Sequence, residues 1–348
     1  MCGFKKPHMA NRYVYRDKSM FYITKENVPD LLLGSNFLGT GGGPPFDMQK
    51  NVFTSILKSE KKICVQQAKD FKEGDFLATV YGVGAASSIH ITPMLIRNSL
   101  KAYEKLTGIK IKGIIPGEIG GEFLAAQAAA IAKLPIVDSD LVGGRAAPEI
   151  QMDVFSVYEL PLTPVYCGSA NEKQMLLNGK FSAQEIEGIS RGFFEANGGD
   201  GILVGYPIAA GHYARVAING TVSRAIKVGE YLSRKDLNGL LEYVGGYLIA
   251  KERVEKVTLQ SKDGFLKGFI TLENFKIWVK NEHIILWNGK KKKVVAPDGI
   301  ALLDSSYTPI HNSNIQEYIG EEVSIVSFPA IGYWKNKKNK KLWDSAFG

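Results

Sequence analysis

The first half of the chain switches repeatedly between apolar runs of strand length and segments with apolar residues at helical spacing. This pattern predicts strands at 76–83, 111–115 and 136–137, with a fourth at 164–166, and helices at 92–106 and 122–133. Strands and helices that alternate through short loops form parallel sheets with right-handed crossovers. We therefore predict an α/β fold with a parallel sheet for the N-terminal domain.

The second half has a looser pattern. Helices are predicted at 181–196, with Ser182 as N-cap, and at 221–233, with a strand at 201–208. Beyond about residue 243, short apolar or alternating runs are separated by turn signals such as Asn288-Gly289, which is typical of antiparallel strands. The expected organisation is a lead-in segment (1–20), an α/β domain that carries the site (21–167) and a mixed domain (168–348) that becomes β-rich after about residue 243.

A glycine-rich loop joins two predicted helices near the start of the chain, one at 25–37 with Thr24 as N-cap and one at 47–57. A dinucleotide-binding fingerprint needs a strand before such a loop, and a P-loop needs Gly-Lys-Ser/Thr after it; neither is present. The backbone N–H groups of the loop could still hold an anion or an oxyanion. The alternative is a tight structural turn. Thr40, Gly41 and Gly42 are the substrate-binding candidates in this loop.

The densest polar chemistry follows the strand at 136–137. Asp138 and Asp140 come directly after the strand, and Arg145 lies in a loop of small residues. Two acids and an arginine between a strand end and a predicted helix start, with a third acid, Glu149, in that helix start, are hard to explain by helix capping alone, so this stretch is the predicted floor of a small-molecule site.

A helix is predicted to begin at Pro148, because proline suits the first helical position, where its missing N–H needs no partner. Glu149, Gln151 and Asp153 would then lie in its first turns. The alternative for Glu149 alone is structural, since a negative charge near a helix N-terminus is stabilised by the helix dipole.

The predicted topology brings separate loops together. Loops that follow parallel strands emerge at the carboxyl edge of the sheet, where open α/β sheets bind ligands. Ser87 and Ser88 follow the first of these strands and Glu118 follows the second. The candidate acid/base residues are Glu118, Asp138, Asp140 and Glu149. The candidate substrate-binding residues are Thr40, Gly41, Gly42, Arg145, Gln151 and Asp153.

Composition narrows the class of protein. The chain has 348 residues, of which 45% are hydrophobic and 22% charged, as in ordinary globular proteins. No apolar run approaches the roughly 18 residues that a membrane span needs, and the N-terminus has no apolar signal region, so we expect a cytoplasmic protein without membrane contacts. The cysteines (Cys2, Cys64 and Cys167) fit no zinc or disulfide pattern.

The formal net charge is +8, and much of it comes from lysine runs at 290–293 and 335–341. Such runs are usually solvated turns or tails. A nucleic-acid binder would also need aromatic platforms. Trp334 and Trp343 flank the second run, so nucleic-acid binding stays an alternative, and the less favoured one.

Taken together, these landmarks resemble the S-methyl thiohydantoin desulfurase family, a two-domain family associated with hydantoinase and oxoprolinase systems. The order and spacing match from about residue 30 to 334, while Glu122 and the segment 87–90 depart from the family pattern. The matching pieces are Leu38-Gly39-Thr40-Gly41-Gly42-Gly43, Glu118-Ile119-Gly120-Gly121, Val137-Asp138-Ser139-Asp140 with Gly144-Arg145-Ala146, Pro148-Glu149-Ile150-Gln151-Met152, Asn281-Glu282 and Pro297-Asp298.

The resemblance implies a hydrolase-type enzyme that removes methanethiol from an S-methylated thiohydantoin ring and leaves a hydantoin. One carboxylate would act as general base, and a carboxyl group with a raised pKa would protonate a ring nitrogen. Arg145 or the N–H groups of the glycine loop would hold developing negative charge. The scheme requires no cofactor or metal, although the clustered acids could bind a divalent cation through oxygen.

Two other readings stay open. No Cys-His or Ser-His pair has interpretable spacing, so the chain could instead be a non-catalytic or accessory subunit of a hydantoinase- or oxoprolinase-type system. Its partners would then be a ring-shaped small molecule and a hydantoinase-like protein. A homo-oligomer is compatible with either reading.

Overall fold

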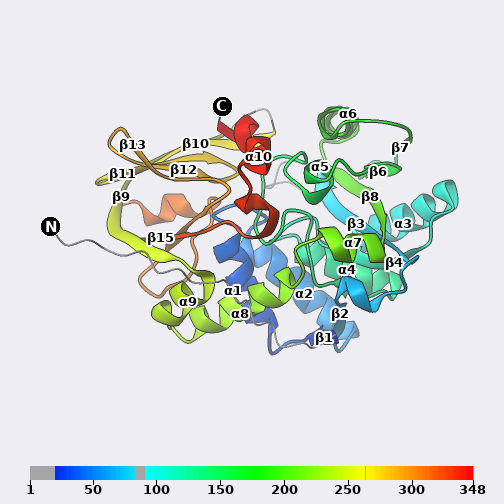
Figure 1. The fold of residues 1–348 in the computed structure, drawn as a ribbon, viewed down its shortest axis with the longest axis horizontal. Helices are drawn as coiled ribbons and strands as arrows, with labels where there is room; N and C mark the ends of the chain where they lie inside the picture. Colours follow the sequence, from blue (N-terminus) through cyan, green and yellow to red (C-terminus); the bar gives the residue numbers. More distant parts are fainter. Residues whose placement is uncertain (1–19, 84–90, 263, 348) are drawn as a thin grey trace.

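The computed structural model describes residues 20–83, 91–262 and 264–347, which form two sheet-based domains (Figure 1). The first sheet has eight strands in the order β1-β2-β5-β4-β3-β8-β6-β7, and the second has seven in the order β13-β12-β11-β10-β9-β15-β14. The predicted fold class, an α/β domain followed by a β-rich domain, is confirmed. Ser87, Ser88 and His90 lie outside the described residues.

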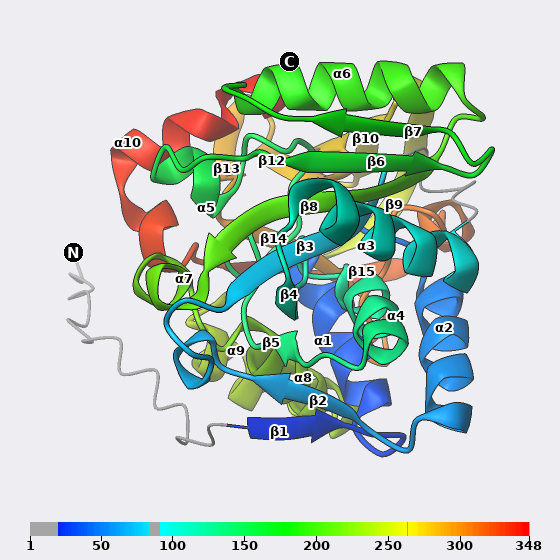
Figure 2. The same cartoon turned by 90° about the vertical axis from the view of Figure 1, so that its right-hand side faces the viewer.

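The first sheet is mixed, whereas the sequence predicted a parallel one. β2, β5, β4 and β3 run parallel, but β8 lies antiparallel beside β3 and β6 lies antiparallel beside β8 (Figure 2). The strand predicted at 164–166 therefore exists as β6 but belongs to the antiparallel half. The strands are β1 (Met20–Ile23), β2 (Ile63–Gln66), β3 (Phe76–Val83), β4 (Ile111–Ile115), β5 (Ile136–Val137), β6 (Val165–Ser169), β7 (Gln174–Leu177) and β8 (Gly201–Ala209).

Most of the predicted helices form within one to three residues of their expected bounds. In α6, Ser182 caps the helix and exchanges hydrogen bonds with Glu185 in a capping box, as its sequence indicates. The α-helices are α1 (Val28–Leu38), α2 (Phe46–Ser59), α3 (Pro93–Thr107), α4 (Glu122–Ala132), α5 (Val154–Val157), α6 (Ala183–Ala196), α7 (Ala210–Val216), α8 (Thr221–Ser233), α9 (Leu237–Val244) and α10 (Lys337–Lys340).

Two predicted helix starts are wrong. α1 begins at Val28 and not at Lys25, because Asn27 precedes the helix and its side chain accepts the Thr24 N–H, while Pro29 occupies the first turn. The helix predicted from Pro148 does not form. Residues 148–153 make turns, and the four-residue α5 begins only after Asp153, whose side chain caps it by accepting the N–H of Ser156.

Alternating side chains divide the first sheet between two cores. In β8, Ile202 and Val204 pack into the core that includes α3 and α4, while Leu203 between them packs into the core that includes α6. Successive side chains of a strand point to opposite faces, so a strand covered on both faces is apolar throughout. This explains why the apolar runs of the sequence predicted these strands well.

Helix α1 packs against α8 at very short range. A Cβ atom on Gly34 would lie 1.7 Å from the carbonyl oxygen of Ala225, and one on Gly229 would lie 1.7 Å from that of Asp30. The two helices can approach this closely only because both positions lack a side chain. The packing fixes the C-terminal end of α1, and the glycine loop begins there.

The second domain is an antiparallel sheet whose long strand β9 pairs with both β10 and β15. Its buried face forms a separate core that includes Val254, Ile270 and Ile325. The predicted turn at Asn288-Gly289 joins β12 to β13. The strands are β9 (Tyr247–Lys262), β10 (Phe265–Leu272), β11 (Phe275–Lys280), β12 (Glu282–Asn288), β13 (Lys291–Val295), β14 (Gly299–Leu303) and β15 (Glu322–Phe328).

After β15 the chain returns to the first domain, and the C-terminal segment, shown in red, lies where the two domains meet (Figure 1). Trp334 donates a hydrogen bond to the carbonyl of Val142, and Trp334 and Trp343 are 1% and 0% exposed. They are core residues, so their rings are not available as stacking platforms for nucleic acid. Of the helices described, none is both long and apolar enough to cross a bilayer.

Candidate functional site

The glycine loop (residues 39–43) is held from the second domain. Three of its carbonyl oxygens, those of Thr40, Gly41 and Gly43, accept hydrogen bonds. The donors are the backbone N–H groups of His283 (2.8 Å) and Asn312 (2.9 Å) and the Nε2 atom of His311 (2.7 Å), in the same order. The loop therefore lies at the interface of the two domains, and its position depends on both.

Glu282, at the start of β12, fits against this loop because the loop has no side chains. A Cβ atom on Gly42 would lie 2.2 Å from Oε1 of Glu282, and one on Gly41 would lie 2.6 Å from Nε2 of His283. Glu282 is 2% exposed, and its Oε2 atom has no hydrogen-bond partner among the described residues. A buried carboxyl oxygen without a partner carries a desolvation cost, which a bound ligand could relieve.

Glu118 lies on the loop between β4 and α4 and faces the same interface. Its Oε2 atom accepts the N–H of Ala147 at 2.9 Å, which ties this loop to the one that carries Arg145. The pKa of Glu118 is raised to about 8, mainly by burial and also by the nearby carboxylates of Asp140 and Glu122, while the Ala147 hydrogen bond and Arg145 act in the opposite direction. Burial and the neighbouring Glu118 also raise the pKa of Glu282 well above its ordinary value.

Arg145 supplies the positive charge beside these two acids. Its guanidinium donates hydrogen bonds to the backbone oxygens of Ala146, Pro297 and Asp298 and to the hydroxyl of Thr40. The ring of Trp343 stacks on it, with 4.3 Å between Cζ and the ring centroid. Burial lowers the pKa of Arg145 to about 10, so it stays charged at neutral pH. With its donors directed at protein atoms, Arg145 acts here as a fixed charge.

Asp138 and Asp140 make structural contacts. Asp140 accepts three backbone N–H groups, those of Val142, Gly143 and Gly144, at 2.6–2.8 Å, and so shapes the loop that leads to Arg145. Burial nevertheless raises the pKa of Asp140 to about 6. Asp138 accepts the N–H and the hydroxyl of Ser223 in the first turn of α8. Both side chains therefore use their oxygens in hydrogen bonds that stabilise the fold.

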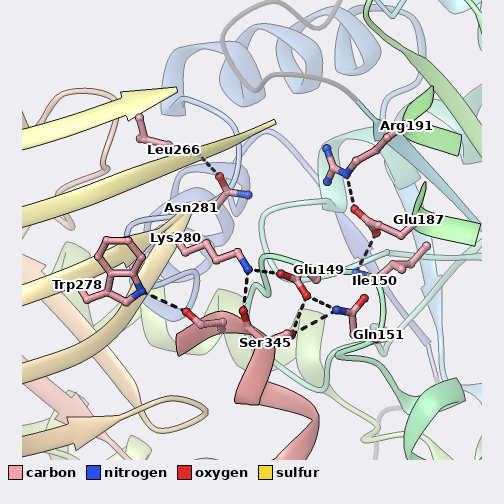
Figure 3. Close-up of polar contacts among 11 residues, drawn as sticks. Glu149, Ile150, Gln151, Glu187, Arg191, Leu266, Trp278, Lys280, Asn281 and Ser345 are labelled. Carbon is pink, nitrogen blue, oxygen red and sulfur yellow. Dashed lines mark hydrogen bonds and ion pairs between the residues drawn. The ribbon is translucent and has the colours of Figure 1, made fainter. Parts of the chain in front are cut away.

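Glu149 lies in a second polar group, with Lys280 of β11 and Ser345 of the C-terminal segment (Figure 3). Lys280 forms an ion pair with Glu149 and donates to the carbonyl of Ser345 at 2.9 Å, while Gln151 donates to Glu149. We call Glu149, Gln151, Lys280 and Ser345 the clasp. The expectation that Glu149 shares a cleft with Glu118 and Asp140 stays a prediction: Glu149 pairs with Lys280, and the charge of Lys280 also acts on Glu282.

The last predicted binding residue, Asp153, is 3% exposed. One of its oxygens caps α5, and the other has no hydrogen-bond partner in the described part of the chain. Burial raises the pKa of Asp153 to about 7. Among the described residues, no group of three or more histidine, cysteine, aspartate or glutamate side chains is arranged to hold a metal ion.

The sequence reasoning missed Glu282 as a chemical group. Asn281-Glu282 was used only as a family landmark. The available signal was an acid at the first position of an otherwise apolar strand, directly after a tight turn in which Asn281 has a φ of 57°. The structure brings together Glu118, Glu282, Arg145 and the glycine loop, and we call these residues the interdomain site.

This fold and this site define a two-domain α/β protein with paired carboxyl groups at the domain interface. The chain belongs to the S-Me-THD-like family: the N-terminal domain of that family matches residues 26–179, and its C-terminal domain matches residues 182–348. The family expected from the sequence is thereby confirmed. The predicted division at residue 167 stays a prediction, and strands β7 and β8 beyond it belong to the first sheet.

The fold also occurs in a solved structure. An X-ray structure of a protein from Chromobacterium violaceum superimposes with a TM-score of 0.79 and 20% sequence identity, covering 94% of this chain and 96% of that one. At this level of identity the likeness shows a shared fold and nothing about activity. No curated protein matches the chain.

Proposed function

We propose that the protein hydrolyses an S-methyl thiohydantoin-like ring to a hydantoin and methanethiol at the interdomain site. The observation that carries the proposal is the pair formed by Glu118, which is half-buried, and Glu282, which is buried, beside one arginine; Oε2 of Glu282 has no hydrogen-bond partner among the described residues. Family membership supports a desulfurase role in general. The reaction and the role of each residue are the proposal.

The reaction balances with water as the only co-reactant. A carboxylate removes a proton from water as the water oxygen bonds to the ring carbon that bears the S-methyl group. The adjacent ring nitrogen takes a proton from a carboxylic acid, which gives a tetrahedral intermediate. The carbon–sulfur bond then breaks, the sulfur leaves with a proton as methanethiol, and the former water oxygen becomes the ring carbonyl.

The two carboxyl groups suit different roles. Glu282 is the more deeply buried, and burial and Glu118 raise its pKa well above its ordinary value, which favours the protonated form, so it is the proposed acid. The pKa of Glu118 is raised to about 8, and Glu118 is the proposed base. Two carboxyl groups in different environments are a common arrangement for acid/base catalysis. Arg145 would stabilise the charge that develops between them.

The test measures thiol release from an S-methyl thiohydantoin with a thiol-reactive dye. Glu118→Gln and Glu282→Gln should each lower turnover by about 10²- to 10⁴-fold, the usual contribution of a general acid or base. Glu122→Gln is the matched control, because Glu122 is a buried carboxyl at the start of α4, directly after the loop that carries Glu118, and already accepts hydrogen bonds from the Ser35 hydroxyl and the Gly120 N–H. It should lose less than about tenfold. No release by the wild type, or equal losses in all three variants, would overturn the proposal.

A second candidate is a non-catalytic subunit that binds the ring for a hydantoinase-like partner. It is favoured by one observation: Asp138, Asp140 and Glu149, three of the four predicted acid/base residues, are engaged in internal contacts. It predicts ring binding by calorimetry without thiol release, and unchanged binding in Glu118→Gln.

A further inference from the structure

A pocket of about 550 Å³ lies on the outer side of the second domain, next to the C-terminal segment. Its walls come from the start of β9, the ends of β13 and β15, and the residues from α10 to Phe347. The volume falls in the range of roughly 300–1,000 Å³ that small-molecule sites occupy. None of the residues that line it belongs to the interdomain site.

The charged side chains around this pocket are mostly lysines. Lys293 comes from the end of β13, and Lys337, Lys340 and Lys341 come from the C-terminal segment. The acids are Asp298 and Asp344. Lys340 lies 3.7 Å from Asp298 and so offsets one of them. Three lysines then face one aspartate, and no ion pair between described residues involves Lys293, Lys337 or Lys341.

The convergence of the lysines distinguishes this pocket from an ordinary solvated lysine run. The run at 290–293 and the run at 335–341 are far apart in sequence, yet one lysine of the first and three of the second line the same concavity. Lys290, Lys291, Lys292, Lys335 and Lys338 do not line it. Tyr247 and Phe328 also line the pocket, but the Phe328 ring is 4% exposed and stacks on Phe37. Tyr247 is 55% exposed, so its ring is open to a ligand.

We propose that this pocket binds a small molecule that carries two or more anionic groups, phosphate or carboxylate, on an apolar body. Positive potential focused in a concave site raises the local concentration of anions, and the exposed ring of Tyr247 would contact the apolar part of the ligand.

The test measures binding of metal-free ATP and of citrate to the full chain by calorimetry at low salt. One of these probes should bind at a single site, and the tighter of the two tells whether phosphate or carboxylate is preferred. Lys337→Gln with Lys341→Gln should weaken binding about five- to tenfold, as expected for the loss of two partly solvated charge contacts. The matched control is Lys335→Gln with Lys338→Gln, which removes the same charge from the same segment and should change binding less than about twofold.

A second pair of variants tests the opposite wall. Lys293→Gln should weaken binding, whereas Lys291→Gln on the same strand should not. All of these lysines are exposed, so the fold should be unaffected, which circular dichroism checks. The proposal is overturned if neither probe binds, if pocket and control variants weaken binding equally, or if a single-stranded oligonucleotide binds more tightly than both probes and responds equally to both double variants.

Discussion

The acids that follow β5 and the acids of the interdomain site differ in what surrounds them. Asp140 accepts three backbone N–H groups, and Asp138 accepts two hydrogen bonds from Ser223. By contrast, a single hydrogen bond from the described residues reaches the Glu118 side chain, and Oε2 of Glu282 has no partner among them. Both regions are buried and acidic, so burial and charge do not separate them; hydrogen-bond partners do.

The difference separates a structural role from a chemical one. A carboxylate that accepts several N–H groups stabilises one loop conformation and has little capacity left for a ligand. A carboxyl group that is desolvated and crowded by another acid has a displaced pKa and a free oxygen, which are the properties of acid/base groups. By this criterion Asp138 and Asp140 position the site, and Glu118 and Glu282 would carry the chemistry.

The largest stability effect should come from the clasp. Lys280→Met removes the cation from an ion pair whose side chains are each 9% exposed, and it leaves Glu149 charged in a buried place. Breaking one side of such a pair costs about 3 kcal/mol or more of the free energy of unfolding, which urea denaturation measures. Lys110→Met is the control, because its pair with Glu104 is solvated, with Lys110 69% exposed, and should cost less than about 1 kcal/mol.

The double variant Lys280→Met with Glu149→Gln sharpens this prediction. Removing both charges should restore at least half of the loss, because the uncompensated carboxylate is then gone. If the double variant is no more stable than Lys280→Met alone, the ion pair is not the source of the effect, and the packing of Lys280 is.

Substitutions of Asp140 and Glu118 should have smaller effects on the free energy of unfolding, and the two effects should differ in sign. Asp140→Asn turns an amide donor toward backbone N–H groups and removes charge-assisted hydrogen bonds, which should cost about 2 kcal/mol at neutral pH. Glu118→Gln removes one of two crowded acids and should leave the free energy of unfolding unchanged or raise it. Urea denaturation at one pH measures the free energy of unfolding of both variants. Equal destabilisation would show that Asp140 and Glu118 do not differ in structural role.

Local periodicity predicted much of the fold. β3, β4 and α8 form with the bounds expected from their sequences, since their apolar patterns agree with their burial. The helix expected from Pro148 failed for a tertiary reason. Glu149 is drawn to Lys280, which is 131 residues away in sequence, and Asp153 caps a later start. A proline marks a position at which a helix can begin, but contacts with residues distant in sequence determine whether the helix forms there.

The candidate site was predictable in part. The topology placed Glu118 near the loop of Arg145, and the structure joins these loops through the hydrogen bond from Ala147 to Glu118. Glu282 could not be placed by local pattern, because a strand of the second domain brings it to the glycine loop. Glu282 lies so close to Gly42 that a side chain at position 42 would collide with it. This requirement for glycine is recognisable only once the positions of both domains are known.

The smallest effect concerns pH, and here stability and activity should move in opposite directions. In the folded protein the pKa values are about 8 for Glu118, about 7 for Glu122 and Asp153, and about 6 for Asp140, all above their ordinary values. A raised carboxyl pKa means that the folded state holds the proton more tightly than the unfolded state. The contribution of such a group to the free energy of unfolding is therefore complete below its pKa in the unfolded state, near 4. That contribution is lost as the pH rises through its pKa in the folded state.

We therefore expect the melting temperature to fall between about pH 5 and about pH 8.5, while turnover rises as Glu118 becomes a base. Glu118→Gln should flatten the upper part of the melting curve against pH. Glu255→Gln, at an exposed position on β9, should leave it unchanged. Glu118 contributes to both trends. If Glu118→Gln keeps the wild-type dependence of the melting temperature on pH, the raised pKa does not belong to Glu118, and the base lies elsewhere.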